Sequence, residues 1–153
     1  MREQSTMVTD LLQTDIDHAA LVHDLKGEIV AAAREAQAAA YAPYSNFPVG
    51  AAVLLSDGTI YRGCNIENAS FGLTVCAERV AIFNAIADGR MDIVAIALVT
   101  TATRLAKPCG ACRQVIAEFS QADNPIMIVS TCAGDEICVE PISALLPDNF
   151  TLL

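Results

Sequence analysis

Cys76-Ala77-Glu78-Arg79 and Pro108-Cys109-Gly110-Ala111-Cys112-Arg113 are the two motifs around which this chain is organised. They provide three thiols in a C…C-x-x-C arrangement, and a carboxylate two residues after the first thiol. Cysteine thiolates bind zinc, and a site with three protein ligands leaves the fourth tetrahedral position open for water. The spacing therefore predicts one catalytic zinc ion per chain, bound by Cys76, Cys109 and Cys112. A redox C-x-x-C pair is the alternative, but it would leave Cys76 and Glu78 without a role.

Glu78 is close enough to a predicted ligand to point into the pocket without binding the metal. A His or Cys, then a Glu, then Pro-Cys-x-x-Cys is the signature of zinc-dependent base deaminases, in which the Glu is the general acid and base. We therefore expect Glu78 to be the catalytic residue that moves protons. A glutamate outside such a motif would be interpreted as a solvated carboxylate on a helix.

Two further stretches precede these motifs, and their order is informative. They are Tyr44-Ser45-Asn46-Phe47-Pro48-Val49-Gly50-Ala51-Ala52 and Gly63-Cys64-Asn65-Ile66-Glu67-Asn68-Ala69-Ser70. With all four stretches in this order, the chain resembles the small, homotetrameric cytidine deaminases that act on free nucleosides. The resemblance runs from about Asp24 to Phe150. It suggests an N-terminal extension at residues 1–23 and a catalytic domain at residues 24–153.

The resemblance implies a reaction and a set of substrate contacts. The reaction is the hydrolytic deamination of cytidine and 2′-deoxycytidine to uridine and 2′-deoxyuridine, in pyrimidine salvage. Phe47 would pack on the pyrimidine, Asn65 and Glu67 would bind the ribose hydroxyls, and the Ala77 N–H would hold the base carbonyl. Without the resemblance, Phe47 would be read as a core aromatic residue and Asn65 and Glu67 as turn formers.

The same resemblance suggests which residues offset the charge of the zinc site and which lie at contacts between subunits. Three thiolates leave a zinc site with a net negative charge, and Arg79 is expected to offset it by donating to a ligand sulfur. Arg113 could do the same or form an ordinary salt bridge, so its role stays open. Phe71 and Phe150 are expected to reach neighbouring subunits' sites. Phe71 stands where the family more commonly has Tyr, so any hydrogen bond from that hydroxyl is absent here.

Composition limits the kinds of partner. Hydrophobic residues make up 54% of the 153 residues and charged residues only 18%, a high apolar share that favours oligomerisation. The resemblance implies that the oligomer is a homotetramer. The net charge of −9, without a basic cluster, makes binding to a polyanion such as DNA or RNA unfavourable. We therefore expect a small, uncharged substrate, which the resemblance implies is a nucleoside, and no nucleic-acid partner.

The sequence also predicts a cytoplasmic protein that does not interact with membranes. It has no run of 18 or more apolar residues, and acidic residues lie where a signal peptide would begin. The six cysteines are accordingly expected to be reduced. Cys64, Cys132 and Cys138 lie in apolar, strand-like surroundings and are predicted to be small buried hydrophobic residues.

Hydrophobic periodicity predicts an α/β fold, a three-layer α/β/α sandwich with a mixed five-stranded sheet. Strands are expected at residues 49–55, 59–64, 93–100, 125–131 and 136–140, and helices at residues 18–40, 75–87 and 109–119, with a last helical turn at 141–146. Only four residues, 132–135, separate the last two strands, too few for a parallel crossover, so these strands should be antiparallel. The two cysteine-bearing helices should direct their N-termini at one point, where partial positive charge stabilises thiolates.

Three other functions compete with nucleoside deamination. A deaminase of a cytosine-nucleoside antibiotic of the blasticidin S type is disfavoured by the intact stretch Asn65-Ile66-Glu67-Asn68. A polynucleotide-editing enzyme is disfavoured by the negative charge and by the short final connection, because editing deaminases are expected to have a helix there. A non-catalytic zinc module used for assembly is disfavoured by the presence of Glu78.

Overall fold

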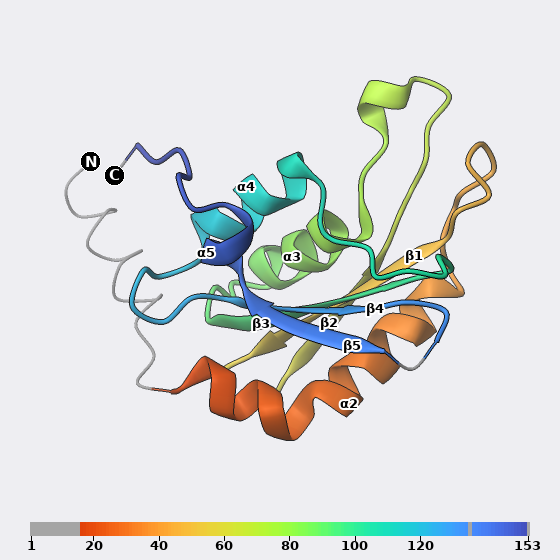
Figure 1. Ribbon diagram of the computed structural model, residues 1–153. Helices are drawn as coiled ribbons and strands as arrows, with labels where there is room; N and C mark the ends of the chain where they lie inside the picture. Colours follow the sequence, from red (N-terminus) through yellow and green to blue (C-terminus); the bar gives the residue numbers. More distant parts are fainter. Residues whose placement is uncertain (1–15, 135, 153) are drawn as a thin grey trace.

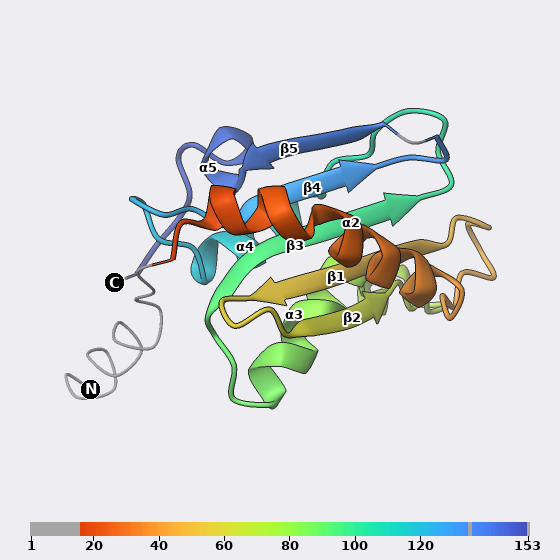
Figure 2. The same ribbon diagram turned by 90° about the horizontal axis from the view of Figure 1, so that it is seen from below.

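A mixed five-stranded sheet forms the centre of the molecule, as the sequence predicted. The computed structural model describes residues 16–134 and 136–152. Its strands lie in the order β2-β1-β3-β4-β5, which Figure 2 shows across the sheet. Only β3 and β4 are parallel, and every other neighbouring pair is antiparallel. The strands are β1 (Val49–Leu55), β2 (Ile60–Cys64), β3 (Ile93–Thr100), β4 (Met127–Thr131) and β5 (Ile137–Pro141).

Helices cover both faces of the sheet, which confirms the predicted three layers. Helix α2 lies on one face, while α3, α4 and the short α5 lie on the other (Figure 1). The bounds are α2 (His18–Gln37), the 3-10 turn η1 (Phe71–Leu73), α3 (Ala77–Ala87), α4 (Gly110–Glu118) and α5 (Ile142–Leu145). Because apolar side chains alternate between the two faces, the described residues form two hydrophobic cores, one beneath each helical layer. Strand β3 is buried along its whole length, as expected for a strand covered on both faces.

Helix α2 begins at the predicted residue and is capped by a side chain. Asp17 Oδ1 accepts hydrogen bonds from the backbone N–H groups of Ala19 at 2.9 Å and Ala20 at 3.2 Å. The helix crosses the predicted division between residues 23 and 24, and Val22 packs in the core beneath it. Residues 1–15 of the predicted extension lie outside the described part of the chain.

Gly63 allows α3 to approach β2 very closely. A Cβ atom at this position would lie 2.3 Å from the Ala81 backbone nitrogen and 2.7 Å from the Ala77 carbonyl oxygen. Asn84 adds a hydrogen bond of 3.0 Å from Nδ2 to the Arg62 carbonyl oxygen. These contacts fix the start of α3, and with it the first cysteine motif, against the sheet.

The C-terminal hairpin has the predicted antiparallel pairing of β4 with β5. Strand β5 is an edge strand, and α5 follows it directly on the face that also carries α3 and α4 (Figure 1). The prediction that three cysteines are buried hydrophobic residues is confirmed for Cys132 only, since Cys64 and Cys138 are partly exposed. Cys138 faces Lys107 and Glu140 instead of an apolar core. Among the described residues, no helix has the length and apolar character needed to cross a membrane.

Candidate metal centre

The three predicted zinc ligands come together where α3 and α4 begin. Cys76 and Cys109 are the N-cap residues of α3 and α4, and Cys112 lies in the first turn of α4. All three Sγ atoms lie within 4.8 Å of one another. Each helix thus directs its unpaired N–H groups and its partial positive charge toward the thiols, as the sequence predicted.

The spacing of the sulfur atoms fits zinc. Zn–S bonds of about 2.3 Å at tetrahedral angles place two sulfur ligands about 3.8 Å apart. Cys76 Sγ and Cys109 Sγ are 3.9 Å apart. The donor set is three sulfurs with no fourth protein ligand among the described residues. This arrangement suits a zinc ion that keeps one position open.

Neighbouring donors favour the ionised form of Cys76. Hydrogen bonding from the Cys112 thiol, supported by Arg79 and Cys109, lowers the pKa of Cys76 to about 5 despite partial burial. The same contact with Cys76, together with burial, raises the pKa of Cys112. Arg79 Nη2 lies 3.8 Å from Cys76 Sγ and donates to the Thr74 carbonyl oxygen at 3.3 Å. Arg79 is therefore placed where the sequence expected it, beside a ligand sulfur.

Glu78 is buried beside the thiols at the start of α3, with 4% of its surface exposed. Burial raises the pKa of its carboxyl group to about 7. A carboxyl group with a pKa near neutral can both accept and release a proton under physiological conditions. The backbone N–H of Ala77, the first residue of the same helix, has no acceptor within the helix and is available to a ligand.

Asn65 and Glu67 both hold the loop that carries Phe47. The Asn65 side chain donates to the Phe47 carbonyl oxygen at 3.0 Å and accepts from the Val49 N–H at 2.8 Å. Glu67 accepts from the backbone N–H groups of Tyr44, at 2.9 Å, and Ser45, at 3.2 Å, and from the Ser45 hydroxyl. These hydrogen bonds lower the pKa of Glu67, so the group is ionised at neutral pH.

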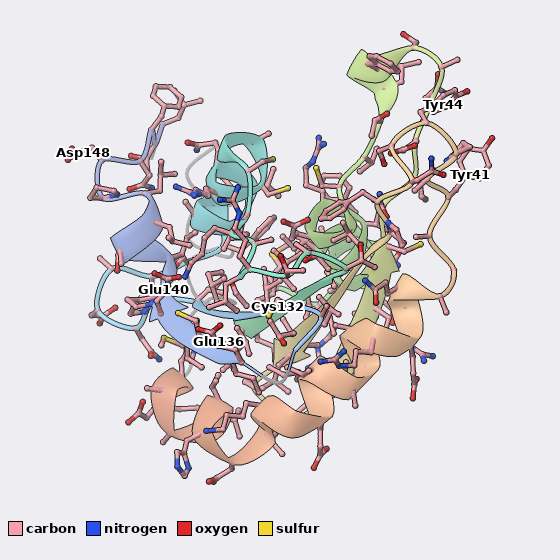
Figure 3. All side chains as sticks on the ribbon, turned by 45° about the vertical axis from the view of Figure 1, so that its right-hand side comes forward. Tyr41, Tyr44, Cys132, Glu136, Glu140 and Asp148 are labelled. Carbon is pink, nitrogen blue, oxygen red and sulfur yellow. The ribbon has the colours of Figure 1, made fainter. Side chains whose placement is uncertain are left out.

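Phe47 itself is 38% exposed, so it is not a core aromatic residue. A cleft of about 320 Å³ is lined by Tyr44, Ser45, Glu67, Phe71 and Thr74. Tyr44, labelled in Figure 3, lies beside the segment that carries η1, and its ring makes an edge contact with Phe71 at 6.2 Å between centroids. The structure thus brings Glu67 and Phe71, which the sequence singled out separately, to one cleft.

Comparison with known proteins shows to which family a chain with this site belongs. A family model described as the cytidine and deoxycytidylate deaminase zinc-binding region matches residues 24–128. The chain belongs to the cytidine deaminase family. A relative from Halalkalibacterium halodurans, named cytidine deaminase, is 51% identical over 80% of this chain and 92% of its own length.

Solved structures of cytidine deaminases have the same fold. The enzyme from Burkholderia pseudomallei matches with a TM-score of 0.76 and 44% identity, over 81% of this chain and 98% of that chain. The enzyme from Mycobacterium tuberculosis matches with a TM-score of 0.71 and 37% identity, over 82% of this chain and 97% of that chain. Family membership and the cysteine cluster together identify the chain as a zinc-dependent deaminase.

Two residues expected at subunit junctions of this cytidine deaminase family member are exposed. Phe71 is 76% exposed and Phe150 is 68% exposed. Phe71 lies on a segment that projects from the body of the molecule, on the side of α3 and α4 (Figure 1). Phe150 follows α5, and its carbonyl oxygen accepts a hydrogen bond of 2.9 Å from Gln114 Nε2.

Arg113 has neither of the roles that the sequence left open. Its Nε donates to the Pro108 carbonyl oxygen at 2.7 Å, and its Nη1 donates to the Leu145 carbonyl oxygen at 2.9 Å. Within the described residues it forms no hydrogen bond to a candidate ligand sulfur and no ion pair with a carboxylate. Sequence reasoning also missed Lys107, which forms an ion pair with Glu140. The only signal for Lys107 was its place directly before the Pro108-Cys109 motif.

Proposed function

We propose that this chain catalyses the hydrolytic deamination of cytidine and 2′-deoxycytidine to uridine and 2′-deoxyuridine, with release of ammonia. The observation that carries the proposal is the buried carboxyl group of Glu78 beside three convergent thiols at the start of α3. Relatives that share about half of the aligned residues are named cytidine deaminases. No feature of the described site favours an antibiotic substrate or a purely structural zinc.

Cys76, Cys109 and Cys112 would hold the zinc ion, and Arg79 would offset part of the charge of the thiolates. When bound, zinc supplies a Lewis acid that lowers the pKa of water from about 15.7 toward 7. The residues of the chain then have to orient the base, move the protons and exclude bulk water.

Glu78 is proposed to move the protons. Its carboxylate takes a proton from the attacking water as the water oxygen bonds to C4 of cytosine, and delivers that proton to ring nitrogen N3. The C4–N bond then breaks, and a second proton passes through Glu78 to the leaving amine, which departs as ammonia. The burial that raises the pKa of Glu78 to about 7 suits a group that must gain and lose protons in each turnover.

Substrate orientation is proposed to come from the N-terminus of α3 and from the loop that carries Phe47. The Ala77 N–H would donate to the base carbonyl, and Phe47 would pack on the pyrimidine ring. Asn65 and Glu67 would bind the ribose hydroxyls while they keep the Phe47 loop in place through the hydrogen bonds described above. These hydrogen bonds support the positioning role, and the ribose contacts are proposed from the resemblance to the family.

We also infer a homotetramer that works in pyrimidine salvage in the cytoplasm. The support is the exposure of large apolar side chains, among them Leu73 at 66%, Phe83 at 49% and Leu152 at 88%. A reducing compartment is consistent with six free cysteines, three of which are needed as metal ligands. The negative charge argues for a nucleoside rather than a polynucleotide substrate.

Loss of cytidine absorbance together with ammonia release tests the function directly. We expect activity from the purified protein, one zinc per chain by metal analysis, and loss of activity when a chelator removes the metal. The matched comparison is the same assay with the Cys109→Ala protein, which should contain no zinc. Turnover by a protein without metal would contradict the proposal, as would zinc binding without any turnover of cytidine or 2′-deoxycytidine.

A further inference from the structure

Cys109 is the most exposed of the three candidate zinc ligands. Cys112 is buried and Cys76 is partly buried, while Cys109 is exposed at the N-cap of α4. The segment before it, residues 101–109, has no regular secondary structure and connects β3 to α4. Whatever fixes the last residues of this segment also fixes the Cys109 thiol.

Lys107 attaches this segment to strand β5. Its ammonium group forms an ion pair with Glu140 Oε1, and the two side chains are only 31% and 24% exposed. Lys107 Nζ also lies 3.3 Å from Cys138 Sγ. Glu140, labelled in Figure 3, lies on β5, and its register partner Ile128 on β4 is fully buried. Because the pair is partly shielded from water, its Coulomb attraction is screened less than that of a fully exposed pair.

Arg113 makes the second attachment. It follows Cys112 on α4, and it joins two backbone carbonyl groups, those of Pro108 and of Leu145 at the end of α5. Pro108 is buried and directly precedes Cys109. Lys107 is therefore linked to β5 by its own side chain, and Pro108 is linked to α5 through the side chain of Arg113. These are the last strand and the last helix of the described chain.

We propose that Lys107, Glu140 and Arg113 are positioning residues for the Cys109 thiol, and that through them β5 and α5 set the affinity of the three-thiol site for zinc. This inference rests on the zinc site of the proposed function. A ligand that is held in place before the metal arrives loses less conformational freedom on binding. Partners outside the ligand shell typically change metal affinity by about 10- to 100-fold.

Substitutions that change the charge in opposite directions distinguish positioning of the thiol from a simple effect of charge on zinc binding. If charge alone mattered, Lys107→Met would remove a cation near the site and tighten zinc binding, whereas Glu140→Gln would weaken it. Positioning predicts that both substitutions weaken zinc binding. It also predicts that the double variant is no weaker than either single variant, because each single change already breaks the same ion pair.

The experiment measures zinc affinity of the full chain by equilibrium competition with a chelator of known affinity. We expect the zinc dissociation constant to rise about 10-fold for Lys107→Met and for Glu140→Gln, and Lys107→Arg to restore most of the affinity. Cobalt bound in place of zinc should show altered thiolate-to-cobalt absorption bands in the two weakened variants. Arg113→Lys provides an independent test of the second attachment and should also weaken binding.

Arg62→Met is the matched control. Arg62 forms an exposed ion pair with Glu35 between β2 and α2, and its loss changes the net charge by the same amount as Lys107→Met. The inference would be overturned if wild type bound one zinc and both Lys107→Met and Glu140→Gln kept the wild-type zinc affinity and cobalt spectra. The proposed function would then still stand. A wild-type chain that binds no zinc would overturn both.

Discussion

Gly63 of β2 and Ala81 of α3 pack backbone against backbone, so closely that a Cβ atom on Gly63 would lie 2.3 Å from the Ala81 nitrogen. This contact brings the axis of α3 close to the sheet and thereby places Cys76, Ala77 and Glu78 at the start of the helix. The absence of a side chain at Gly63 on β2 thus determines where the N-terminus of α3, which carries the candidate metal ligand Cys76, lies against the sheet.

Gly63→Ala is therefore expected to destabilise the protein and to disturb the metal centre. The new methyl group would collide with backbone atoms, and overpacking of a core typically costs about 1–3 kcal/mol. Chemical denaturation should show the loss in the free energy of unfolding, and zinc content should fall with it. Gly27→Ala is the control, because Gly27 lies within α2 with nothing near its Cβ position, and alanine is favoured there by about 0.5–1 kcal/mol. Equal stability of the two variants would contradict the packing argument.

Glu78→Gln is expected to retain zinc and nucleoside binding but to lose most of its turnover. Glutamine has nearly the same shape as glutamate but cannot transfer a proton, and general acid–base catalysis typically contributes about 10²–10⁴-fold. The measurement is kcat for cytidine together with zinc content and the binding of uridine. Glu118→Gln, a change of an exposed carboxylate on α4, should leave all three unchanged. If Glu78→Gln kept kcat within a few-fold of the wild type, Glu78 would not be the proton carrier.

The cluster of candidate zinc ligands could be predicted from the sequence because the chemistry requires particular residue types at short spacings. Cys109 and Cys112 are one helical turn apart. Cys76 lies two residues before Glu78, in a motif that has few interpretations other than a zinc-dependent deaminase site. The antiparallel β4–β5 pairing was predictable for a similar reason, since residues 132–135 are too few for any other connection.

Contacts between distant segments could not be predicted in this way. Arg113 binds the carbonyl oxygen of Leu145, 32 positions away, and any residue type at position 145 would offer the same carbonyl. The Lys107–Glu140 ion pair depends on how β5 lies beside the loop, which the hydrophobic pattern does not specify. Asn65 and Glu67 could be proposed as site residues only through a resemblance, because their hydrogen bonds to the Phe47 loop depend on the tertiary structure.

His18 is expected to make the stability of the fold depend on pH. Burial lowers the pKa of His18 from 6.5, in spite of the hydrogen bond of 3.1 Å between Nδ1 and the Pro125 carbonyl oxygen. Below pH 6.5 the unfolded chain therefore binds a proton that the native state takes up only at lower pH. The stabilising contribution of neutral His18 is present above this pH and is lost as the pH falls through the interval between the two pKa values.

Replacement of His18 by asparagine should accordingly be more destabilising at pH 7.5 than at pH 5.5. Asparagine retains a donor near the position of Nδ1 but does not titrate. Urea denaturation at several pH values would give the difference in the free energy of unfolding between wild type and variant. His23→Asn serves as the comparison, because the His23 side chain is 79% exposed. A difference between wild type and His18→Asn that is constant across the pH range would contradict this assignment.

Phe150→Ala tests whether neighbouring chains complete one another's sites. The substitution removes an exposed ring and retains the carbonyl oxygen that Gln114 binds, so the C-terminal segment should keep its attachment to α4. If Phe150 contributes to the site of a neighbouring chain, the variant should bind cytidine more weakly, and its KM should rise while zinc content stays the same.

Mixing Phe150→Ala chains with Glu78→Ala chains separates this effect from a loss within one chain. In a random tetramer of equal proportions, about one quarter of the sites would combine an intact Glu78 with an intact Phe150 from a neighbour. Activity at low cytidine concentration should therefore rise above the sum of the two separate proteins after the chains exchange. Light scattering should show four chains in each preparation. If the ring of Phe150 acts only within its own chain, no combination of the two variants can restore a site, and the mixture would show only the sum of their activities.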